Sequence, residues 1–85
     1  MRLDAFNLRE ARKAYEEESL KADHVRIFSS DGCRVADLVF VFADGDDRRR
    51  LFDDIVVPLL AKGYRFEICN GAEVLSAFGP DGVYL

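Results

Sequence analysis

Residues 24–43 read HVRIFSSDGCRVADLVFVFA, and this stretch decides the fold class. Its first part, residues 24–29, is rich in β-branched and aromatic side chains, and Asp31-Gly32 then supplies a strong turn signal. Its second part, residues 34–43, is the most apolar segment of the chain. Two such runs around a turn predict a paired β-hairpin.

The second strand of this hairpin carries apolar side chains on both faces. Because side chains alternate along a strand, one face holds Ala36, Leu38, Phe40 and Phe42, and the other holds Val35, Asp37, Val39 and Val41. Apolar groups on both sides are typical of a central strand. We therefore expect residues 38–42 at the centre of the sheet. Helices should cover one face, and a partner, most simply a second copy of the chain, should cover the other.

An amphipathic helix is predicted before the hairpin, over residues 8–22. Asn7 and Glu10 match a capping box, and Phe6 is placed to pack on Ala11 as a hydrophobic staple. The apolar positions at helical spacing form one narrow buried face: Leu8, Ala11, Tyr15 and Ala22.

A second amphipathic helix is predicted after the hairpin. Asp46 or Asp47 should cap its start, and Gly63 should end it as a left-handed stop. Pro58 should disturb it near Val57, because proline removes one backbone hydrogen bond. Its buried face is broad and follows the helical period: Leu51, Phe52, Ile55, Val56, Leu59 and Leu60.

The remaining residues are predicted to form strands. Residues 64–69 alternate between apolar and polar side chains, and Asn70-Gly71 is a preferred hairpin turn. Residues 72–78 return as a strand or as a short helix, two alternatives that the pattern leaves open, and residues 83–85 form a short terminal strand. The order is α-β-β-α-β-β, with the terminal strand as a fifth. The predicted class is α+β, a two-layer sandwich with two helices on one face of a mainly antiparallel sheet.

Length and composition indicate a single acidic domain, residues 1–85. A net charge of −4 and a pI of about 4.9 repel phosphate backbones and anionic membranes, so we expect neither nucleic acid nor a membrane as a partner without a local basic patch. Cys33 and Cys69 lie far apart, and the first residues lack the apolar run of a signal peptide. These features predict a reducing compartment, the cytoplasm.

Two local clusters suggest alternative functions. Asp44-Gly45-Asp46 resembles an Asp-x-Asp pair that holds Mg²⁺ beside a phosphate, so a small metal-dependent enzyme is one alternative. Capping of the next helix accounts for the same aspartates without a metal. Arg48, Arg49 and Arg50 are suited to phosphates, so a nucleic-acid-binding protein is the other alternative. The neighbouring aspartates can instead neutralise these arginines.

The chain lacks a recognisable catalytic set. His24 is the only histidine, so the sequence supplies neither a serine triad nor a two-histidine metal site. We predict a non-catalytic protein-interaction module (a regulator, stoichiometric inhibitor or accessory subunit) that binds a protein partner or itself and needs no cofactor or metal. Acidic clusters such as residues 16–18 are suited to a basic partner surface. The expected contact residues are Val35, Val39, Val41, Val83, Tyr84 and Leu85.

Overall fold

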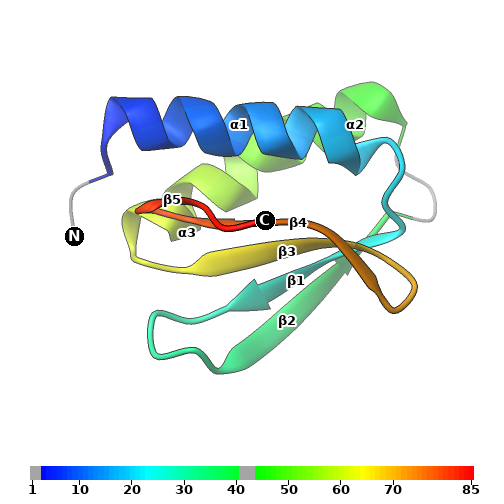
Figure 1. Ribbon diagram of the computed structural model, residues 1–85. Coiled ribbons are helices and arrows are strands. Elements are labelled where there is room, and N and C mark those ends of the chain that lie inside the picture. The colour runs from blue at the N-terminus through cyan, green and yellow to red at the C-terminus, as the bar shows by residue number, and fades with distance from the viewer. Residues whose placement is uncertain (1–2, 41–43) are drawn as a thin grey trace.

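The computed structural model describes residues 3–40 and 44–85 (Figure 1). Its five strands form one antiparallel sheet in the order β2-β1-β3-β4-β5. The predicted α+β class and the predicted order of elements are confirmed, and residues 73–79 are a strand. The elements are α1 (Ala5–Ser19), β1 (His24–Phe28), β2 (Arg34–Val39), α2 (Gly45–Leu51), the π-helical segment η1 (Phe52–Val56), α3 (Val57–Ala61), β3 (Arg65–Asn70), β4 (Glu73–Gly79) and β5 (Gly82–Val83).

The helices pack on one face of the sheet, and the core lies between the two layers (Figure 1). The ring of Phe52 links the layers, because its centroid lies 5.2 Å from that of Tyr15 on α1 and 6.3 Å from that of Phe78 on β4. Phe66 on β3 stacks on Phe78 at 5.6 Å. The buried core residues are Ala11, Tyr15, Ala22, Val25, Ile27, Phe40, Phe52, Val56, Leu60, Phe66, Ile68 and Phe78.

Helix α1 begins one turn earlier than the sequence pattern predicts. The Asp4 carboxylate is the N-cap, and it accepts hydrogen bonds from the backbone N–H groups of Phe6 at 2.7 Å and Asn7 at 3.3 Å. The predicted capping box of Asn7 and Glu10 is therefore wrong. The Asn7 side-chain amide instead donates to the carbonyl oxygen of Pro80 at 3.2 Å, which ties α1 to the β4–β5 turn. The predicted staple is also wrong, because Phe6 is 58% exposed.

Replacing Asp4 with alanine should lower the free energy of unfolding by about 1 kcal/mol, because the first turn of α1 loses its N-cap acceptor. Glu10→Ala is the control, since Glu10 would be needed only for the capping box. Urea unfolding followed by circular dichroism measures both variants. A loss of stability in Glu10→Ala alone would contradict the assignment of Asp4 as the cap.

The second helix runs without a break through α2, η1 and α3. The caps predicted at Asp46 or Asp47 are wrong, because the N-cap is Asp44, two residues before Asp46, which accepts a hydrogen bond from the N–H of Asp47 at 2.8 Å. The disturbance predicted from Pro58 takes the form of a π-helical segment just before it. Proline has no N–H to donate and crowds the carbonyl one turn back, and the wider turn accommodates both effects. Gly63 has a φ of 91° and ends the helix as predicted.

Strand β2 lies at an edge of the sheet, so the predicted central position is wrong. Figure 1 shows it at the side of the sheet away from α1. The central positions belong to β1 and β3, whose inward side chains, such as Val25 and Ile68, are fully buried under the helices. The apolar character of residues 34–43 therefore does not reflect central pairing. Phe40 follows the strand into the core at 1% exposure, and Val41 and Phe42 lie outside the described residues.

Candidate interaction surfaces

The edge strand β2 exposes two large apolar side chains. Opposite residues of an antiparallel pair share a face, so Leu38 points with Val25 toward the helices and Val39 points with His24 to the outer face. Val35 is 53% exposed and Val39 is 64% exposed. On the side of β2 away from β1, the described part of the chain provides no strand. This edge therefore offers unpaired backbone groups together with apolar side chains.

Two features of β2 restrict what can pair with this edge. The register shifts between Ile27 and Phe28, which marks a β-bulge opposite them. Arg34 and Asp37 form an ion pair on the exposed strand, and the hydrogen bond from Arg34 lowers the pKa of the Asp37 carboxyl. Bulges and charged side chains are common protections of edge strands against indiscriminate pairing. The β2 edge is therefore suited to a selective contact.

The outer face of the sheet carries charged as well as apolar side chains. Arg26 and Glu67 lie opposite each other on β1 and β3 and form an ion pair at 3.4 Å. Paired charges therefore interrupt this face, which is not the continuous apolar surface that the sequence pattern led us to expect.

The predicted contact residues at the C-terminal end divide between the two faces of the sheet. Val83 lies opposite Phe78 and faces the helices, whereas Tyr84 lies over the outer face. The Tyr84 hydroxyl donates to Asp81, and the ring lies 5.9 Å from the Arg65 guanidinium. Burial, with help from the Asp81 carboxylate, raises the pKa of Tyr84 to about 12. Tyr84 is thus held in place by its neighbours, although half of it remains exposed.

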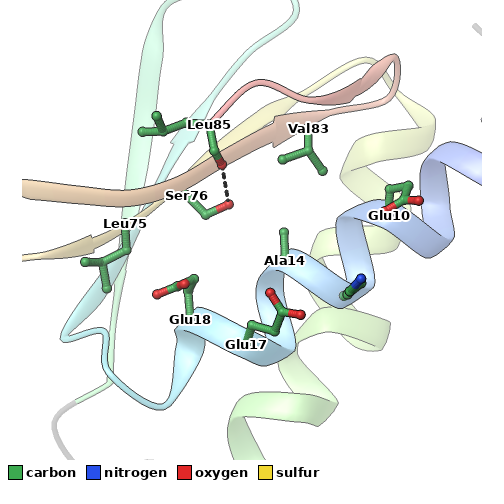
Figure 2. Close-up of a pocket in the computed structure, with 9 residues that line it drawn as sticks. Glu10, Ala14, Glu17, Glu18, Leu75, Ser76, Val83 and Leu85 are labelled. Carbon is green, nitrogen blue, oxygen red and sulfur yellow. Dashed lines mark hydrogen bonds between the residues drawn. The ribbon is translucent and has the colours of Figure 1, made fainter.

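A groove between α1 and the β4–β5 edge gathers residues that the sequence pattern did not bring together (Figure 2). Its volume is about 340 Å³. Figure 2 shows Leu75 and Val83 projecting from the sheet toward α1, and Glu17 and Glu18 on the α1 side of the space. The helical spacing of residues 10, 14, 17 and 18 could have predicted that they share one face of α1. It could not predict which strands lie opposite that face. The lining residues are Glu10, Lys13, Ala14, Glu17, Glu18, Leu75, Ser76, Val83 and Leu85.

Arg48 lies apart from the rest of the arginine cluster. Its guanidinium donates to the carbonyl oxygens of Ser19 and of Ala22, the latter at 3.1 Å, and lies 4.8 Å from the centre of the Phe40 ring. These carbonyls belong to the C-terminal end of α1 and the residues after it, where backbone acceptors lack helical partners. Arg48 therefore helps to end α1 at Ser19, three residues before the predicted end at residue 22.

Arg49 and Arg50 lie on the surface beside aspartates. Arg49 is 3.8 Å from the Asp46 carboxylate, and Arg50 is 2.7 Å from that of Asp47. Because Arg48 turns toward α1, the structure brings only two of the three predicted phosphate contacts to the surface.

Asp44 and Asp46, the alternative metal ligands, have separate roles. The Asp44 carboxylate caps α2, whereas Asp46 is exposed beside Arg49. Residues 3–40 and 44–85 contain no group of three or more side chains arranged to hold a metal ion.

The single histidine and the buried thiol also make structural contacts. The Asp23 carboxylate lies 2.6 Å from His24 Nδ1 and accepts a hydrogen bond from the Gly71 N–H at 3.0 Å, which joins the β3–β4 turn to the start of β1. The bond from Gly71 is the main cause of the lowered pKa of Asp23. Burial raises the pKa of the Cys69 thiol, which keeps it protonated and weakly nucleophilic. Cys33 and Cys69 are both free.

None of the helices in the described segments is long and apolar enough to cross a bilayer.

No family model, no curated protein and no solved structure matches the chain. The fold defines a two-layer α+β domain.

Proposed function

We propose that this chain is a non-catalytic protein-interaction module, a regulator, inhibitor or accessory subunit that binds a protein partner or a second copy of itself. The observation that carries this proposal is the edge strand β2, which exposes Val35 and Val39 beside backbone groups with no described neighbouring strand. A partner strand would form main-chain hydrogen bonds there and remove both valines from water.

The contacts of the polar groups support the same proposal. Asp44, one of the alternative metal ligands, caps a helix, and Arg48, one of the alternative phosphate contacts, binds backbone carbonyls. Groups that the sequence offered for metal or phosphate chemistry therefore have structural contacts of their own. The free thiols agree with a reducing compartment, and we place the protein in the cytoplasm as part of this proposal.

Replacing Val39 with lysine should weaken binding at β2 about tenfold or more, because the partner would have to bury a charge in place of an apolar side chain. Leu20→Lys is the matched control, since Leu20 on the other layer is exposed to the same extent, 64%. The measurements are sedimentation of the purified protein at micromolar concentration and affinity capture from source-cell lysate, with and without nuclease. Circular dichroism should confirm that both variants are folded.

The expected result is a self-associated species, or a stoichiometric protein partner, that Leu20→Lys retains and Val39→Lys loses. Equal retention by both variants would exclude β2 as the contact surface. Recovery of nucleic acid alone, sensitive to nuclease and salt, would favour the alternative based on Arg49 and Arg50.

A further inference from the structure

The groove between α1 and the β4–β5 edge has an apolar floor and an acidic wall (Figure 2). Ala14, Leu75, Val83 and Leu85 supply the apolar side chains, and Leu85 is 65% exposed. Three glutamates line the same space, with Lys13 as the one cation among the lining residues. The groove therefore combines apolar contact area with an excess of negative charge.

The glutamates of this wall differ from three aspartates of the second helix. Asp46, Asp47 and Asp53 each lie within ion-pair distance of an arginine. The carboxylates of Glu10, Glu17 and Glu18 make no ion pair or hydrogen bond within residues 3–40 and 44–85. Their charge is thus available to a cationic partner, whereas each of these three aspartates already has an arginine beside it.

The sheet edge beside this groove is also incomplete. β4 spans Glu73–Gly79, but β5 pairs with it only at Phe78 and Gly79, and backbone bonds from Tyr84 and Leu85 extend the contact to Ala77. The Ser76 hydroxyl also donates to the Leu85 carbonyl oxygen at 2.9 Å, and residues 73–75 have no described strand on this side. An extended peptide lying along them would pass beneath the glutamates of α1.

We propose that this groove binds an extended, basic segment of a partner protein. The aliphatic stems of Lys or Arg, and apolar residues between them, would cover Leu75 and Val83, while the charged ends reach Glu17 and Glu18. Main-chain pairing with β4 would fix the direction of the segment. This inference rests on the proposed function but uses the edge of the sheet opposite β2.

A synthetic peptide of alternating Arg and Val, about six residues long to match a usual strand, is the probe. The full chain, labelled with ¹⁵N, is titrated with this peptide and with Glu–Val and Ser–Val peptides of equal length. The expected result is saturable shifts of the amides of Ala14, Ser76 and Val83 with the Arg–Val peptide. The Ser–Val peptide should bind at least about fivefold more weakly, and the Glu–Val peptide should not bind.

Two double variants test whether the charge effect comes from the groove. Glu17→Gln/Glu18→Gln should weaken Arg–Val binding about fivefold, whereas Glu16→Gln/Asp54→Asn, which removes the same number of charges elsewhere, should change it less than about twofold. Equal effects of the two double variants would show attraction by net charge alone and overturn the proposal. Shifts confined to other parts of the sheet, or no shifts, would also overturn it. Val39→Lys should bind the peptide with unchanged affinity, because Val39 lies on the opposite edge of the sheet. Loss of the groove proposal and loss of the β2 interface proposal are therefore distinguishable results.

Discussion

Phe52→Ala is expected to lower the free energy of unfolding by about 3–5 kcal/mol, because it removes a buried ring and leaves a cavity. Phe52 is 1% exposed, and its ring contacts Tyr15 and Phe78 while the Arg12 guanidinium lies 4.7 Å above it. A domain of this length has a total stability of about 4–12 kcal/mol, so the loss should leave the variant close to unfolding. Urea denaturation followed by circular dichroism measures the change.

Phe6→Ala is the matched control for this prediction. Phe6 is 58% exposed on α1, so the same substitution should change the stability by less than about 0.5 kcal/mol. Phe52→Leu keeps the site apolar and should lose less than alanine, which provides a measurable transition if the alanine variant does not fold. Equal urea midpoints for Phe52→Ala and Phe6→Ala would contradict the arrangement of the core.

Arg48→Ala is expected to cost about 2–3 kcal/mol of stability, because backbone carbonyls at the end of α1 lose a charged donor while they remain partly buried. The stacking of Arg48 on Phe40 is lost as well. Thermal and urea unfolding measure the effect. Arg48→Lys should fall between the wild type and alanine, since lysine retains the charge but not the planar fork of donors.

The adjacent arginine provides the control for Arg48. The Arg49 side chain is 63% exposed and lies 3.8 Å from Asp46, so Arg49→Ala should change the stability by less than about 0.5 kcal/mol. A similar loss in both alanine variants would contradict the structural role of Arg48. A structural role for Arg48 also limits the nucleic-acid alternative, because only Arg49 and Arg50, each beside an aspartate, are then exposed to phosphates.

Local patterns predicted the elements well. The helical period from Leu51 to Leu60 and the stop at Gly63 are local features, and the structure contains both. The turn at Asp31-Gly32 likewise separates β1 from β2. The turn predicted at Asn70-Gly71 lies one residue later, at residues 71–72, because Asn70 ends β3 and pairs with Glu73. Helix ends were harder to predict, because Asp4 and Asn7 are both residue types that favour the N-cap position. The tertiary contact of Asn7 with Pro80 engages its side chain elsewhere, and Asp4 caps the helix.

The candidate surfaces were predicted in part. The exposure of Val39 follows from its alternation with Leu38, which points with Val25 toward the helices. Val35 lies at the β-bulge, where the register shifts, so simple alternation does not account for its exposure. The groove could not be predicted, because the acidic face of α1 meets Leu75 and Val83 only after the sheet has formed. Residues this far apart in the chain are brought together by strand order, which no local pattern encodes.

The amino-acid sequence alone determined that the chain forms two helices and a largely antiparallel sheet, because alternation, helical period and turn residues act over a few neighbouring positions. Only the tertiary structure decided that β2 is an edge strand, that Arg48 binds the end of α1, and that Val83 and Tyr84 lie on different faces. An apolar side chain is equally favourable against any apolar neighbour, since hydrophobic burial has no direction. Which strands and side chains become neighbours therefore depends on the packing of the whole chain.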